Sequence, residues 1–326
     1  MRAFITQTLL PLIICTNNSH IESKSDGMEI LKIIIRLARE KIVEIRGWIF
    51  IRSKAKHSII FSRTINHQNA IDLISIAYNQ DSLIKLQSKL LKKFVTDEIT
   101  YHVVDNSTNQ DTSSLLVNFS IKNKISYYKL PTNPSNFPSI SHGYALNWAL
   151  HNITAKSNNI YYGFLDHDIF PVKKTSVIRE LKGQAFYGHQ QKRRNLIYLW
   201  PGFCFFDKRK INPKELNFLP IYLWPEFCFF DKRKKNPKEL NFLPDTFLKL
   251  DTGGRLFKKI KKVSISEIKW PQHSYIRILN DSKTIQENCV EKIDNWIHLM
   301  NGGEWKKTNE KKKKLGLIYI KKLQKF

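Results

Sequence analysis

The stretch that decides the fold is residues 160–171, IYYGFLDHDIFP. Its apolar first half predicts a buried strand that runs directly into Asp166, His167 and Asp168. Two carboxylates one residue apart, where a strand leaves a sheet, can share a divalent cation, and hard oxygen ligands suit Mg²⁺ or Mn²⁺. Such a cation neutralises a diphosphate. The alternative is a solvated turn with a helix-capping aspartate, which a D-x-D spacing without this context would favour.

Strands and helices alternate on the amino-terminal side of this stretch. Residues 67–93 carry helical periodicity, and residues 141–151 predict a helix with Ser139 or Ser141 as its N-cap. Further strands are predicted over residues 58–62, 99–104 and 125–130. The alternation predicts an α/β fold, a mainly parallel sheet sandwiched by helices, in which ligands bind at the carboxyl ends of the strands.

Two other segments lie near that end of the predicted sheet. Asp105 follows a strand in HVVDNS and can accept a hydrogen bond from a base or ribose, or it can form an Asx-turn. Residues 141–147, SHGYALN, would start a helix whose free N–H groups face an anion, with Gly143 letting a ligand approach the backbone. An ordinary capped helix, packed into the core, is the alternative for this segment.

An internal duplication interrupts the carboxyl-terminal half. Residues 197–220 and 221–244 agree at 22 of 24 positions, and only the pairs Gly202/Glu226 and Ile211/Lys235 differ. Two copies of one strand cannot fill the same place in a sheet. We therefore expect one copy in the core and the other in a loop or at an edge.

Composition excludes several classes of protein. With 42% hydrophobic residues the chain can bury a core, and no apolar run is long enough for a transmembrane helix. Four cysteines in 326 residues, without a C-x-x-C pair, form neither a disulfide framework nor a structural zinc site. The net charge of +26, from 54 basic and 28 acidic residues, suggests either an anionic partner or a background of Lys-rich composition.

Taken together, these segments resemble nucleotide-sugar glycosyltransferases of the GT-A fold, in particular family 2. The segments that carry the resemblance are IIFSR, VVDNS, the G-x-A-L-N helix and LDHD, in the family's order. We therefore expect a GT-A-like glycosyltransferase domain over residues 56–305. Residues 1–55 would be an amino-terminal helical extension, and residues 306–326 a Lys-rich tail.

The resemblance implies a role for several residues. Asp105 matches the residue that contacts the nucleotide base, while Asp166 and Asp168 match the pair that binds the metal and the donor diphosphate. His298 matches a histidine that often completes the metal site. Asp251 would accept the proton of an acceptor hydroxyl. Within the G-x-A-L-N helix, Gly143 and Asn147 would contact the donor.

The implied function is hexosyl transfer from a nucleotide-diphosphate sugar to a glycan or lipid-linked acceptor, assisted by Mn²⁺ or Mg²⁺. The duplication puts activity in question, because the second copy carries Glu226 where the first has Gly202. The alternatives are a basic membrane- or nucleic-acid-binding protein with a degenerate transferase fold, and a nucleotidyltransferase. We expect a cytoplasmic protein whose tail either rests on the inner face of a membrane or is a solvated charge run.

Overall fold

The computed structural model divides the chain into two compact units, Met1–Arg46 and Gly47–Phe326. The residues that it describes are 31, 35, 38, 42–61, 69–181, 183–193, 196–211, 268–279, 285–300 and 310–324. In the first unit the described residues are helical, and both sheets belong to the second. Among the described segments, no helix has both the length and the apolar character that crossing a membrane requires.

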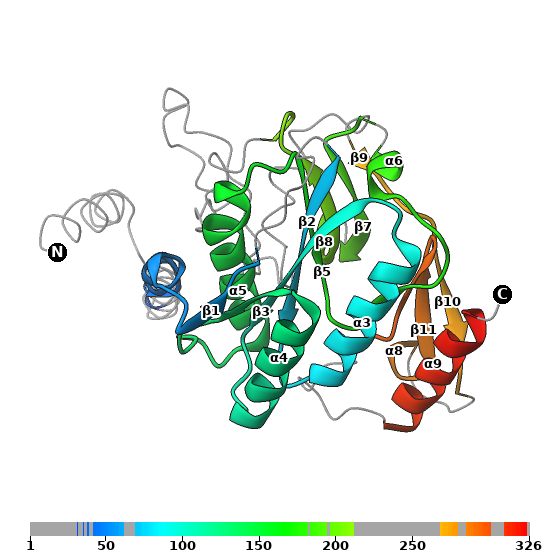
Figure 1. Cartoon of the computed structure of the whole chain (residues 1–326), viewed down its shortest axis with the longest axis horizontal. Coiled ribbons are helices and arrows are strands. Elements are labelled where there is room, and N and C mark those ends of the chain that lie inside the picture. The colour runs from blue at the N-terminus through cyan, green and yellow to red at the C-terminus, as the bar shows by residue number, and fades with distance from the viewer. Residues whose placement is uncertain are drawn as a thin grey trace, which may run out of the picture. The chain divides into compact units, whose positions relative to one another are not determined.

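The larger sheet has its strands in the order β1-β4-β3-β2-β5-β8-β7-β9 (Figure 1). These strands are β1 (His57–Ile59), β2 (Ala70–Ala77), β3 (Glu98–Asp105), β4 (Ser126–Lys129), β5 (Tyr161–Leu165), β7 (Phe186–Arg193), β8 (Leu196–Asp207) and β9 (Ile268–Lys269). The central strands β4, β3, β2 and β5 run parallel, and β8 joins β5 in the antiparallel direction. The carboxyl ends of the parallel strands therefore share one edge, as the sequence predicts.

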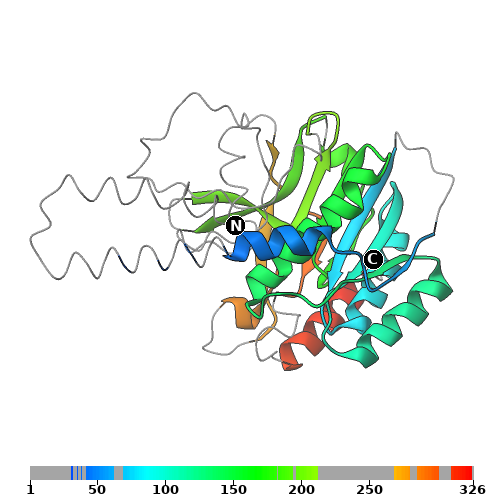
Figure 2. The same ribbon diagram turned by 90° about the vertical axis from the view of Figure 1, so that its left-hand side faces the viewer.

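Helices cover both faces of the parallel strands (Figures 1 and 2). They are α3 (Asp81–Phe94), α4 (Gln110–Asn123) and α5 (Pro138–Asn152), with the short η1 (Thr154–Lys156) and α6 (Val177–Leu181) following along the chain. Consecutive strand residues point to opposite faces. Accordingly, Tyr127 packs into the core cluster beneath α3 and α4, while Tyr128 contacts Trp148 of α5. The two layers of helices thus shield a sheet with no solvated face at its centre.

A second sheet has the order β10-β11-β12-β6. Its elements are β6 (Ile169–Pro171), β10 (His273–Arg277), β11 (Cys289–Ile293) and β12 (Trp296–His298), with α8 (Ile285–Asn288) before β11. One face, including Ile169 and Trp296, packs against the larger sheet. The other, including Phe170 and Ile297, packs against helices. Because β6 follows β5 after only three residues, this sheet begins at the aspartate pair.

The described part of the Lys-rich tail is helix α9 (Glu310–Leu323), which lies beside β10, β11 and α3 (Figure 1). Ile320 is fully buried in the cluster formed by α3 and the second sheet. Gly316 packs so closely that a Cβ atom there would lie 2.7 Å from Leu299 Cδ2. The solvated charge run considered from the sequence is therefore wrong for this helix, because its apolar side completes a core.

The structure corrects three sequence predictions about elements. Residues 67–93 are not one helix: residues 70–77 form β2, buried along its whole length, before α3 begins at Asp81. The apolar spacing of AIDLISIA suits a helix as well as a strand buried on both faces, so periodicity alone could not decide. The second correction concerns the buried strand predicted at residues 58–62. In the structure this region contains the three-residue edge strand β1, which is largely exposed.

The third correction concerns α5, which begins at Pro138 rather than at Ser139 or Ser141. Proline is favoured at the first helical position, because its fixed φ suits a helix and the N–H that it lacks has no intrahelical partner there. The three remaining predicted strands are confirmed, and each of their ends lies within two residues of the predicted one. Residues 99–104, 125–130 and 160–165 correspond to β3, β4 and β5.

Candidate active site at the end of strand β5

The aspartate pair lies where β5 leaves the larger sheet and β6 starts the smaller one. The Asp166 N–H donates to Gly202 O on the neighbouring strand β8, at 2.8 Å. The Ile169 N–H donates to Asp166 O at 3.1 Å and closes a tight turn. The position at the carboxyl end of β5 is thus the one that the sequence predicts for ligand binding.

Asp168 lies beside His298, which is 130 residues away in the sequence. Strand β12 pairs with β6, with His298 opposite Ile169, and the Leu299 N–H donates to Asp168 O at 3.0 Å. As a result, His298 Nε2 lies 3.7 Å from Asp168 Oδ1. Of the three residues predicted to hold a metal, the structure therefore brings Asp168 and His298 face to face.

The Asp166 side chain has a different neighbour. His142 of α5 places Nε2 at 3.3 Å from Asp166 Oδ1. Burial alone would raise the Asp166 pKa, but the positive charges of His142, His167 and His298 outweigh it, so the pKa lies below its ordinary value. Burial would likewise lower the His298 pKa, and the negative charges of Asp168 and Glu291 raise it above its ordinary value. Asp166 is thus held as a carboxylate, and each of the two aspartates lies beside a histidine.

The side-chain atoms of Asp168 and His298 that face each other are of the types that bind a divalent cation. Carboxylate oxygen and imidazole nitrogen are the ligands that Mn²⁺ accepts. Within the described residues, however, no group of three or more His, Cys, Asp or Glu side chains is gathered so as to hold a metal ion. Asp168 and His298 fit such an ion as a pair, and Asp166 lies on the same turn with its carboxylate toward His142.

A buried glutamine supports the aspartate turn from beneath. Gln87 of α3 donates from Nε2 to Asp166 O at 2.7 Å and to Ile169 O at 2.8 Å. Its Oε1 accepts from Ser75 Oγ and from Tyr101 OH, both at 2.7 Å. The bonds to Ser75 and to Ile169 are buried and the other two are part-buried, so the glutamine holds the backbone of the turn from its sheltered side.

The first repeat copy forms the wall of the site. Its residues 197–207 make up nearly all of β8, which pairs with β5 and β7. A Cβ atom on Gly202 would lie 2.5 Å from Asp166 Oδ2 and would also collide with the Trp200 indole. Trp200 in turn lies over His298, with ring centroids 4.7 Å apart. The second copy, residues 221–244, lies outside the described residues, so its predicted displacement stays a prediction.

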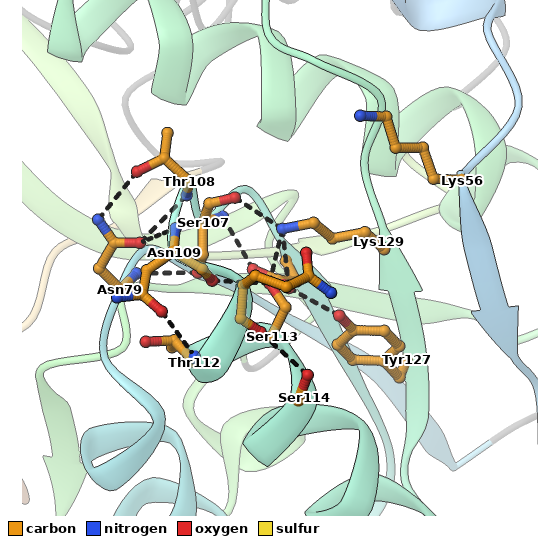
Figure 3. Close-up of polar contacts among 12 residues, drawn as sticks. Lys56, Asn79, Ser107, Thr108, Asn109, Thr112, Ser113, Ser114, Tyr127 and Lys129 are labelled. Carbon is orange, nitrogen blue, oxygen red and sulfur yellow. Dashed lines mark hydrogen bonds and ion pairs between the residues drawn. The ribbon is translucent and has the colours of Figure 1, made fainter.

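Asp105 lies at the end of β3 and is fully buried. Its Oδ2 accepts from Tyr127 OH at 2.6 Å and from Lys129 Nζ at 3.1 Å, and its Oδ1 accepts from the Ser107 N–H at 2.8 Å. Figure 3 shows Lys129 directed into the same group, where it also donates to Ser107 O and to Ser113 Oγ. The structure thus places Asp105 in an internal polar cluster, with the predicted contact to a base untested.

The predicted donor-contacting residues of α5 lie inside the helix. Gly143 and Asn147 are both buried, six and ten positions along a helix that begins at Pro138. The free N–H groups of the helix therefore belong to residues before Gly143. Asp251, the predicted base, lies outside the described residues.

Sequence reasoning missed His142, Gln87 and Glu291. His142 stood within the segment SHGYALN, but only the packing of α5 shows that it meets Asp166. Gln87 is one polar residue on the buried side of an otherwise amphipathic helix, which is a usable signal for a buried hydrogen bond. Glu291 carries no signal in its own segment, CVEKI.

Comparison with known proteins yields structural neighbours. No protein-family model matches the sequence, and no curated protein matches it. An active-site mutant of LgtC matches with 13% identity and a TM-score of 0.32, over 43% of this chain and 58% of its own. The mannosyltransferase PcManGT from Pyrobaculum calidifontis, solved with GDP-Man and Mn²⁺, matches with 11% identity and a TM-score of 0.31, over 56% of each chain. The mannosyltransferase Ktr4p from S. cerevisiae matches with 9% identity and a TM-score of 0.33, over 53% of this chain and 66% of its own.

These matches span less than two thirds of the neighbours' own lengths. The architecture itself agrees with the sequence prediction. Its four parallel strands lie between helices, and the aspartate pair stands where β5 ends. The chain therefore has the α/β fold that the sequence predicts, a mainly parallel sheet sandwiched by helices.

Proposed function

We propose that this protein transfers a sugar from a nucleotide-diphosphate donor, with a divalent cation at the aspartate pair. The observation that carries the proposal is the approach of His298 Nε2 to within 3.7 Å of Asp168 Oδ1. Two side chains from distant segments supply oxygen and nitrogen donors at the edge of the sheet where ligands bind. The sequence resemblance predicts both Asp168 and His298 as metal ligands, together with Asp166.

Each group would have a distinct task. Asp168 and His298 would hold the cation together with Asp166, and the cation, when bound, would offset charge on the leaving diphosphate. Trp200 offers an aromatic face of the kind that packs against sugar rings, and it already lies against His298. Asp251 would accept the acceptor's proton, and Asp105 would act on the base side. We propose a glycan or lipid-linked acceptor.

The location of the first repeat copy bears on activity. The wall of the site contains Gly202, and not the carboxylate that the second copy would bring. Strand β8 therefore carries Gly202 and not the extra negative charge that Glu226 would add. This supports a working transferase over the degenerate fold considered from the sequence.

The test is turnover of UDP- and GDP-sugars with Mn²⁺, comparing the wild type with Asp168→Ala. Loss of one carboxylate should reduce turnover by roughly 100-fold or more, because the charge on the leaving group is then poorly offset. Asp111→Ala, at an exposed position on α4, is the matched control and should leave turnover unchanged. Equal turnover in wild type and Asp168→Ala would refute the role of the pair.

A further inference from the structure

Glu291 lies at the centre of a row of residues that crosses the second sheet. In the register of the strands, Glu291 of β11 stands opposite His298 of β12, and His298 stands opposite Ile169 of β6. Glu291 Oε2 lies 2.9 Å from His298 Nδ1. The glutamate is 4% exposed, so this contact is sheltered from water. A buried carboxylate therefore engages the ring nitrogen of His298 that faces away from Asp168.

The second oxygen of Glu291 reaches the larger sheet. Oε1 lies 3.1 Å from Nε2 of His189, which is also buried. The pairing of β7 with β8 shifts register between Gly188 and Gln190, so His189 lies in an irregularity of the strand. Bulges of this kind redirect a side chain. Here the redirected imidazole connects β7 to β11.

Trp200 completes the arrangement. Its ring centroid lies 5.7 Å from that of His189 and 4.7 Å from that of His298. Rotation of either imidazole would disturb this packing as well as the contact with Glu291. The His298 ring is thus restrained by Glu291 at Nδ1 and by the Trp200 ring on one face, and its Nε2 points toward Asp168.

We propose that Glu291 is a positioning residue that orients His298 Nε2 toward the cation site, with His189 holding the second oxygen of the carboxylate. The inference rests on the proposed function, since it assigns His298 as a ligand. In proteins, a histidine that binds a metal commonly donates its other N–H to a carboxylate or carbonyl, which fixes the ring. Loss of such a partner typically weakens metal affinity about 10–100-fold.

A purely structural role for Glu291 would be a bridge between the two sheets, and the chain offers a matched comparison for it. Asp294, in the turn that joins β11 to β12, also bridges the sheets: its Oδ2 accepts from Tyr187 OH of β7 at 2.9 Å. Its Oδ1 accepts from the Gln272 N–H at 2.9 Å. Because the two Asp294 oxygens are engaged by Tyr187 and Gln272, Asp294→Asn alters a bridging carboxylate while the contact between Glu291 and His298 stays in place.

The experiment measures binding of Mn²⁺ alone to the full chain by EPR of the free ion. Glu291→Gln should weaken Mn²⁺ affinity about 10–100-fold, whereas Asp294→Asn should leave it unchanged. Both variants are compared with wild type for thermal stability. Unchanged Mn²⁺ affinity in folded Glu291→Gln would overturn the proposal, and so would an equal loss in Asp294→Asn.

A second measurement is made on the wild type and depends neither on metal binding nor on the folding of Glu291→Gln. Long-range ¹H–¹⁵N spectra of the wild type, with the His298 signals assigned by His298→Asn, show whether Nδ1 carries a proton. A proton on Nδ1 is expected, and its absence would overturn the proposal. If Nδ1 is protonated and Mn²⁺ binding depends on Glu291 but no donor sugar turns over, the positioning role stands and the proposed function fails.

Discussion

Gly202 and Asp166 are in such close approach that any side chain at residue 202 would collide with the carboxylate. A Cβ atom there would lie 2.5 Å from Asp166 Oδ2, a separation that real Cβ atoms do not show. Gly202 is also one of the two positions at which the repeat copies differ. The other, Ile211, is buried at 6% exposure. Both differences therefore favour the first copy in β8.

This relationship predicts unequal effects of deleting either copy. Deletion of residues 221–244 leaves Gly202 and Ile211 in place. Deletion of residues 197–220 produces the same chain except for glutamate and lysine at those two positions. We expect the second deletion to be less stable by roughly 3 kcal/mol or more, because it overpacks the site and buries a lysine. Urea unfolding of the two 302-residue proteins, 326 less 24, measures the difference. Equal midpoints would contradict the assignment.

Gln87 is itself fully buried and should matter for stability through its four hydrogen bonds, two of which are buried. Glu at this position can still accept from Ser75 and Tyr101 but cannot donate to the carbonyls of Asp166 and Ile169. We expect Gln87→Glu to lower the free energy of unfolding by roughly 2–4 kcal/mol, since buried acceptors lose their donor. Gln110→Glu, at an exposed position on α4, is the control and should stay within about 0.5 kcal/mol.

Asp105→Asn tests whether that carboxylate is structural, binds the nucleotide, or does both. The substitution leaves the part-buried Lys129 ammonium without its anionic partner. We expect destabilisation of about 3 kcal/mol, because removing one member of a buried ion pair costs more than the pair is worth. Denaturant unfolding measures this, and calorimetric binding of UDP and GDP to the folded variant tests the predicted contact to the base. Full stability would show that the cluster around Lys129 is dispensable.

The tail helix should contribute through its apolar side and not through its charge. Ile320→Ala removes a fully buried side chain from the cluster that includes Phe170 and Ile297, and we expect a loss of about 2–5 kcal/mol. Lys321→Gln and Lys322→Gln are adjacent exposed controls, each expected within about 0.5 kcal/mol. Thermal unfolding separates the two cases. A larger loss of stability in the lysine variants than in Ile320→Ala would show that the tail helix stabilises the fold through its charge.

Lys312 should make stability rise at alkaline pH. Its Nζ donates to Met300 O at 2.7 Å, and burial lowers its pKa from 10.5 to about 8 despite the opposing Asp168 charge. Between those values the unfolded chain binds more protons than the folded one, so this group adds stability as pH rises. Lys312→Met should therefore remove part of the increase between pH 8 and 10.5, measured by urea midpoints. Lys311→Met, at an exposed neighbour, should keep the wild-type slope.

The sequence by itself determined the α/β class and the edge of the sheet that carries the aspartates. Local patterns suffice there, because a strand that ends in charged residues must leave the core at that point. The pattern was ambiguous at β2, where residues 70–77 are buried on both faces. Burial on both faces removes the alternation that distinguishes a strand from a buried helix.

Only the tertiary structure decided which groups surround the aspartates. His142 and Gln87 come from α5 and α3, and no spacing in the sequence records that these helices meet at the aspartate turn. His298 of β12 was expected there only from the family resemblance, and the pairing of β12 with β6 is what brings it to Asp168. The same holds for the repeat: the sequence shows two copies, and the close approach of Gly202 to Asp166 and the burial of Ile211 favour the first. Sequence periodicity reports how a residue relates to its own element, whereas the site depends on contacts between elements, which packing alone creates.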